Sequence, residues 1–63
     1  MSPARLAANR YKNKRGHYRR AILVNGKRVA TCEDTQQALR DMFLMVTSVL
    51  DAIGMRWISD GPG

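Results

Sequence analysis

The residues of this chain best suited to chemistry are cations, and they gather in its first half. Residues 1–31 hold nine lysines and arginines and no acid, whereas residues 32–63 hold two arginines against five acids, within a net charge of +6. The nine are Arg5, Arg10, Lys12, Lys14, Arg15, Arg19, Arg20, Lys27 and Arg28. A basic region set against a mildly acidic one is the electrostatic footprint of a protein that binds a polyanion.

Aromatic rings interrupt the densest basic run, at residues 10–20, where Tyr11, His17 and Tyr18 lie among the cations. Such rings stack on exposed bases while the cations contact phosphates. A solubilising tail is the plainer interpretation, but the charge continues into a strand-forming segment, which a mere tail does not require. We therefore predict nucleic-acid binding, with DNA favoured over RNA. The predicted contact residues are Arg10, Lys12, Lys14, Arg15, Arg19, Arg20, Lys27, Arg28, Tyr11 and Tyr18.

No grouping of residues in the sequence suits catalysis or metal binding. His17 is the only histidine and Cys32 the only cysteine, and no glycine-rich loop precedes a helix in the pattern that cradles phosphate. We predict no enzyme activity, no metal and no cofactor. A lone cysteine in an apolar strand fits the reducing cytoplasm, and no apolar run suits a signal peptide or a membrane span. The expectation is a cytoplasmic protein without membrane contact.

The elements that must position these cations begin with a hairpin. Two strand-favouring runs, residues 18–24 and 27–32, flank Asn25-Gly26, the pair best suited to a type I′ turn. A two-residue turn sets Val24 opposite Lys27, and further along it sets Ile22 opposite Val29 and Arg20 opposite Thr31. The face that we expect to pack on a helix consists of Tyr18, Arg20, Ile22, Val24, Lys27 and Val29.

A helix is predicted next, over residues 35–53, with Asp34 as its N-cap and Gly54 as its terminating residue. Its apolar residues span about half of the helical wheel, which is wider than the stripe of about 100° that a small sheet covers. Residues 55–58 supply Met55, Trp57 and Ile58 as a third strand or a lid. A second copy of the helix would cover the rest, so we predict a homodimer. The candidate interface residues are Leu39, Phe43, Met45, Leu50 and Ala52.

The length of 63 residues allows one domain, because a chain this short hides only about 60% of its unfolded surface. We predict an α+β fold in which a two- or three-stranded antiparallel sheet, with its hairpin at 18–32, packs on one amphipathic helix. The hairpin-helix domain spans residues 17–58. A flexible basic arm, residues 1–16, precedes it, and Ser2-Pro3 would allow a short helix there on a polyanion. Residues 59–63 form a disordered tail.

The strings GHY at residues 16–18, ILVNGKRVA at 22–30 and DTQQA at 34–38 resemble the hairpin and helix of integrase arm-type DNA-binding domains and AP2-like domains. In that family a small sheet enters the major groove and basic strand residues make the contacts. The resemblance implies this role for Arg19, Arg20, Lys27 and Arg28. The family carries a third strand before the helix, and we predict only two there.

The same strings also resemble double-stranded RNA-binding domains, which we rank lower. Lysines at the start of the final helix grip phosphate in that family, whereas this chain has Glu33, Asp34, Gln36 and Gln37 there. The predicted function is therefore a small DNA-binding accessory or regulatory factor of a phage or mobile element. The alternative is a small phage-type inhibitor that binds a host protein through its basic surface or its helix face.

Overall fold

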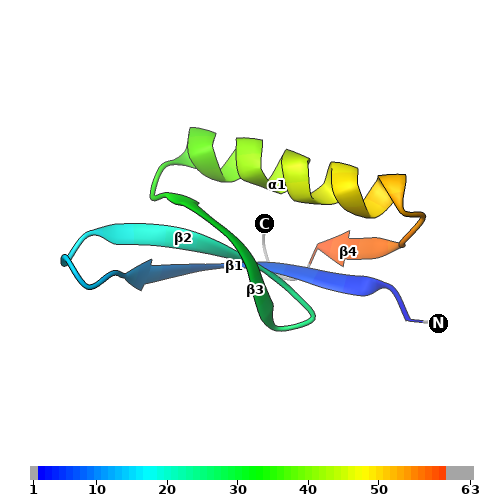
Figure 1. Ribbon diagram of the computed structural model, residues 1–63, viewed down its shortest axis with the longest axis horizontal. Coiled ribbons are helices and arrows are strands. Elements are labelled where there is room, and N and C mark those ends of the chain that lie inside the picture. The colour runs from blue at the N-terminus through cyan, green and yellow to red at the C-terminus, as the bar shows by residue number, and fades with distance from the viewer. Residues whose placement is uncertain (1, 60–63) are drawn as a thin grey trace.

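The computed structural model describes residues 2–59 and confirms the α+β class. Its elements are β1 (Ala4–Lys12), β2 (Tyr18–Val24), β3 (Lys27–Glu33), α1 (Gln36–Ala52) and β4 (Trp57–Ser59). The strands form one sheet in the order β3-β2-β1-β4, in which β4 runs parallel to β1 and the other neighbours are antiparallel. α1 lies across one face of this sheet (Figure 1).

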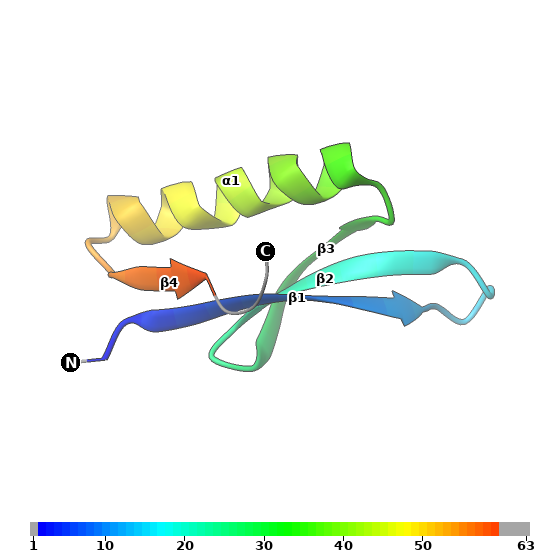
Figure 2. The same ribbon diagram turned by 180° about the vertical axis from the view of Figure 1, so that it is seen from behind.

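The first strand corrects the prediction of a flexible arm and of a short helix within it. Residues 4–12 pair with β2 over seven positions, and β1 runs beside β2 in both views (Figure 2). Ala4 and Leu6 are 3% and 0% exposed, while Arg5 between them is exposed. Alanine has a low intrinsic preference for strands, so tertiary pairing rather than local propensity decides this segment. A third strand therefore precedes the helix.

The turn between β2 and β3 has the predicted form. Asn25 and Gly26 both have positive φ, at 53° and 80°, as a type I′ turn requires. Val24 pairs with Lys27 across it. The local register is therefore confirmed.

Beyond the turn the predicted register is wrong by one residue, because β3 carries a β-bulge at Val29. Ile22 pairs with Ala30, and Arg20 pairs with Cys32. The extra residue moves Val29 out of the core, so that its side chain is 50% exposed. It also places Cys32 in the core, where that residue is 6% exposed. Ile22 is fully buried as expected.

The helix matches the prediction to within a residue at each end, but its N-cap differs. Thr35 caps α1, because its Oγ1 accepts a hydrogen bond of 3.1 Å from the backbone N–H of Ala38. Asp34, the predicted cap, binds two arginines instead. At the other end Gly54 has the positive φ of 76° that a terminating residue adopts.

The core lies between α1 and the sheet, and it uses part of the predicted dimer interface. Leu50 is 8% exposed, and Leu39 and Phe43 are half-buried, so these three pack within the protein itself. Only Met45, at 62% exposure, and Ala52 stay open among the predicted interface residues. The prediction that Leu50 belongs to a dimer interface is therefore wrong, because Leu50 is part of the core.

The last strand pairs with the first three residues of β1 and corrects the predicted tail at residue 59. Trp57 packs edge-on against Phe43, with ring centroids 5.9 Å apart, and its Nε1 donates a hydrogen bond of 2.9 Å to Asp51. The rest of the predicted tail, residues 60–63, lies outside the described residues. Within residues 2–59, α1 is too short and too polar to cross a membrane.

Candidate nucleic-acid interface

The face of the sheet turned away from α1, here called the open face, is defined by the strand register. Cross-strand partners point to the same side, so the pairs around Leu23 and Ala21 identify its members. They are Arg5, Ala7, Asn9 and Tyr11 of β1, Arg19, Ala21 and Leu23 of β2, and Arg28, Thr31 and Glu33 of β3. This face is the one that α1 leaves uncovered (Figures 1 and 2).

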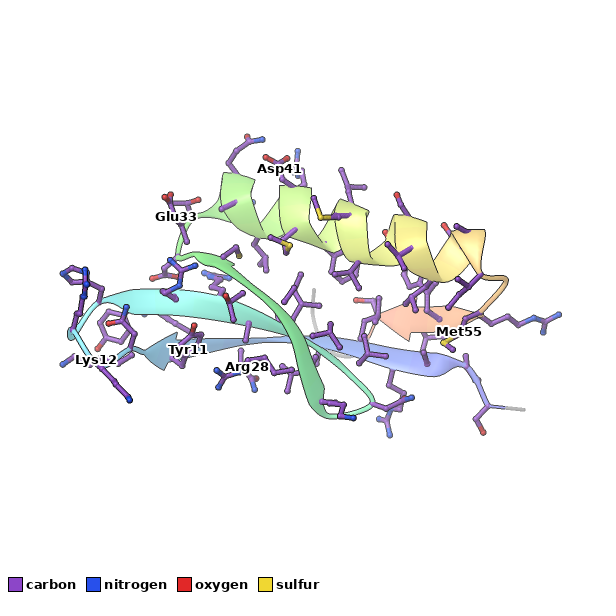
Figure 3. The ribbon with its side chains drawn as sticks, viewed as in Figure 1. Tyr11, Lys12, Arg28, Glu33, Asp41 and Met55 are labelled. Carbon is purple, nitrogen blue, oxygen red and sulfur yellow. The ribbon has the colours of Figure 1, made fainter. Side chains whose placement is uncertain are left out.

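An arginine and a tyrosine meet across the centre of the open face. The guanidinium carbon of Arg28 lies 4.7 Å from the centroid of the Tyr11 ring, and Figure 3 shows Arg28 on the side of the sheet away from α1. The register puts Ala21 midway on the diagonal between the two residues. Ala21 is only 2% exposed although it is on this face. We attribute that burial to the two long side chains meeting above it.

Two arginines of the open face carry charge that no acid neutralises by direct contact. Within residues 2–59 neither Arg19 nor Arg28 forms a salt bridge. Glu33 ends the register of this face as the cross-strand neighbour of Arg19, but Figure 3 shows it beside the start of α1. The rest of the face has no acid among the described residues and is positive.

Arg5 belongs to the open face and was missed by the sequence prediction of the site. Its backbone N–H donates to Asn25 Oδ1 at 3.0 Å, and its carbonyl accepts from the Asn25 N–H at 2.8 Å. These bonds fasten the β2–β3 turn to β1. The only local signal for this is Arg5 between the apolar residues Ala4 and Leu6, and the alternation is interrupted at once by Ala7.

The β1–β2 turn presents two further predicted cations, Lys14 and Arg15, which are exposed. Asn13 organises this turn, because its Oδ1 accepts hydrogen bonds from the backbone N–H groups of Arg15 and His17 at 3.0 and 2.9 Å. Gly16 adopts φ of 82° there. The cations therefore extend from an ordered turn rather than from a flexible arm.

Other predicted contact residues lie on the helix side of the sheet and bind within the protein. Asp34 accepts hydrogen bonds from Arg20 Nε at 2.8 Å and from Arg10 Nε at 2.9 Å. The bond from Arg20, aided by the charges of both arginines, holds the pKa of Asp34 below its usual value against an opposing effect of partial burial. Arg10 also stacks on the ring of Tyr18, at 4.1 Å.

The ten predicted contact residues therefore divide between two faces and two turns. Tyr11, Arg19 and Arg28 share the open face, and Lys14 and Arg15 extend beyond one of its ends. Lys27 is exposed beside the turn at the other end. Those on the helix side are Arg10, Lys12, Tyr18 and Arg20.

No family model, curated protein or solved structure matched the chain. Among the described residues, no three histidine, cysteine or acidic side chains come together as metal ligands. The arrangement of charge on the sheet is thus the strongest indication of what the protein binds.

Proposed function

We propose that the protein binds double-stranded DNA by laying the open face of β1, β2 and β3 against the duplex. The observation that carries this proposal is the position of Arg19 and Arg28, whose charges lack an acidic partner at contact distance within residues 2–59. They project from a rigid sheet on the side that α1 leaves uncovered. Such groups bind phosphate oxygens and the acceptor edges of guanine.

The shape of the surface favours DNA over RNA. The major groove of B-form DNA admits strands of a β-sheet, whereas the major groove of A-form RNA is too narrow and deep for side chains to read. Lys14 and Arg15 lie at one end of β2 and Lys27 at the other. Cations at both ends of a sheet in the groove would reach the phosphates on either side of it.

The third strand supports the resemblance to integrase arm-type domains, in which three strands precede the helix. Of the four residues to which that resemblance assigns DNA contacts, Arg19 and Arg28 lie on the open face and Lys27 beside its turn. Arg20 is engaged by Asp34 on the helix side, so we leave it out of the proposed interface. The role is binding without catalysis, and it fits a cytoplasmic regulatory factor.

Fluorescence anisotropy with a labelled duplex of about 20 base pairs tests the proposal. We expect binding at ~50 mM salt that weakens steeply as salt rises, because bound cations release counterions from phosphate. The double variant Arg19→Gln/Arg28→Gln should bind at least about tenfold more weakly and lower the salt slope by about one unit per lost contact.

The control is the double variant Arg40→Gln/Arg56→Gln, which removes the same charge from α1 and from the loop before β4. It should lose much less affinity than the open-face variant. Equal losses in the two variants would show that net charge rather than the open face governs binding. An absence of binding to duplex DNA at ~50 mM salt, where such contacts are strong, would refute the proposal.

A further inference from the structure

A groove of about 420 Å³ lies between the first half of α1 and the edge of β1, on the side of the sheet away from β3. It shares only Ala7 with the open face. Its lining is mostly apolar and consists of Leu6, Ala7, Ala8, Gln36, Leu39, Arg40, Phe43, Leu44 and Ser59. Leu44 is 58% exposed, so a ligand in the groove can bury more of its apolar surface.

The floor of this groove is a strand edge that β4 only partly covers. β4 pairs with Ala4, Arg5 and Leu6, whereas β1 continues to Lys12. The backbone N–H of Ala4 donates a hydrogen bond toward the β4 side, to the carbonyl of Arg56. The carbonyl of Arg5 accepts one on the β2 side, from the N–H of Asn25. Because these directions alternate along a strand, the backbone groups of Ala8, Arg10 and Lys12 point to the outer edge. No strand within residues 2–59 pairs with them.

Backbone groups and side chains therefore offer complementary contacts at one place. An extended chain placed beside β1 would continue the line of β4 and form backbone hydrogen bonds with Ala8 and Arg10. Its alternate side chains would point toward Leu39, Phe43 and Leu44. Strand addition to a sheet edge obtains affinity from the first kind of contact and specificity from the second.

The charges around the groove select the kind of strand. Arg40 is the only charged residue in its lining, and within residues 2–59 it forms no salt bridge. A second copy of β1 paired edge to edge would present its own helix-side cations, Arg10 and Lys12, toward this arginine, and like charges repel. A strand with an acidic side chain at that place is attracted instead.

We propose that this groove binds an extended segment of another protein as an added strand beside β1. The side chains that this strand directs toward α1 are apolar opposite Leu39, Phe43 and Leu44, and acidic beside Arg40. The site lies at the edge of the sheet, and it does not depend on whether the open face binds DNA.

The probe is a seven-residue peptide with valine at positions 2 and 4, glutamate at position 6 and threonine elsewhere, so that valine and glutamate share the face toward α1. It is acetylated and amidated at its ends and titrated to ~1 mM into the full chain, labelled with ¹⁵N. We expect chemical shift changes at the amides of Ala8, Arg10 and residues 36–44. Leu44→Ser should weaken binding about tenfold, which corresponds to losing the burial of one leucine. Met45→Ser, on the other flank of α1 and of similar exposure, should leave affinity unchanged.

A peptide of the same sequence with N-methylated backbone amides separates strand pairing from attraction to a basic protein, because it keeps the charge and loses the donors. It should bind at least about tenfold more weakly. Equal binding of the two peptides, equal effects of the two variants, or an absence of binding would overturn the proposal. Concentration-dependent shifts of the same amides without peptide would identify a second copy as the occupant and would also overturn it.

Discussion

Arg20 and Asp34 are joined by a hydrogen bond of 2.8 Å from Nε to Oδ1, and this bond ties the middle of the sheet to the residue before the helix cap. Arg10 completes the arrangement from β1 at 2.9 Å. One carboxylate that is 19% exposed thus holds cations from two neighbouring strands. Without it, Arg10 and Arg20 would be adjacent like charges across the strand pair.

Asp34→Asn is expected to destabilise the protein at neutral pH and to have little effect in strong acid. The folded state lowers the pKa of Asp34 from its usual value of 3.8, so its stabilising effect is complete above that value and is lost as pH falls through the lower folded value. Urea unfolding of both proteins at pH 2 to 7 measures the difference. Glu33→Gln is the charge-matched control, and it should show a smaller difference at neutral pH. A difference for Asp34→Asn that did not change with pH would contradict this account.

Gly26→Ala should lower the free energy of unfolding by about 1 kcal/mol, because the residue has φ of 80°, where a β-carbon is strained. No atom lies within 4 Å of the position that the added carbon would take, so backbone strain alone sets the cost. Gly26→Asn should cost less, since asparagine tolerates this conformation better. Chemical denaturation measures both, and an alanine variant as stable as the asparagine variant would contradict the assigned turn.

Leu50→Ala should destabilise the protein by about 2–4 kcal/mol, because it leaves a cavity in the core between α1 and the sheet. Leu44→Ala removes the same side chain from a position that is 58% exposed, and it should change stability by no more than about 0.5 kcal/mol. Thermal unfolding of the two variants compares them. Similar losses would contradict the assignment of Leu50 to the core and of Leu44 to the surface.

The homodimer stays a prediction, now based on the exposed flank Met45, Val49 and Ile53 rather than on Leu50. Apolar surface of this kind favours association by about 25 cal/mol for each Å² buried. Sedimentation equilibrium at micromolar concentration should show a dimer that Met45→Lys dissociates. A monomer of 7.1 kDa at all concentrations would rule the prediction out.

What the sequence predicted well depends on short-range rules, and what it missed depends on partners far along the chain. The Asn25-Gly26 turn and the end of α1 at Gly54 follow from neighbouring residues. β1 was missed because its alanines become a strand only through pairing with β2. The bulge at Val29 has no distinct local pattern, and it alone reversed which residues of β3 face the core.

The same difference between short-range and long-range determinants explains what the sequence predicted of the candidate site. Asp34 has the residue type of a helix cap, and only the fold brings Arg10 and Arg20 close enough to compete for it. The sequence therefore named the cations as one set, while their division between the two faces required the register of all three strands. Arg5 was omitted because it precedes the dense basic run at residues 10–20 on which the prediction was based.

The pairing of Ala4 with Trp57 joins the first and last strands of the described chain, and it bears on the order in which the strands assemble. The ribosome makes β1 well before the strand that pairs with its edge. The nascent chain can assemble β1, β2 and β3 by short loops, but closing the β1–β4 contact requires the long loop between them. The pairing of β4 is therefore expected to be a late step of folding.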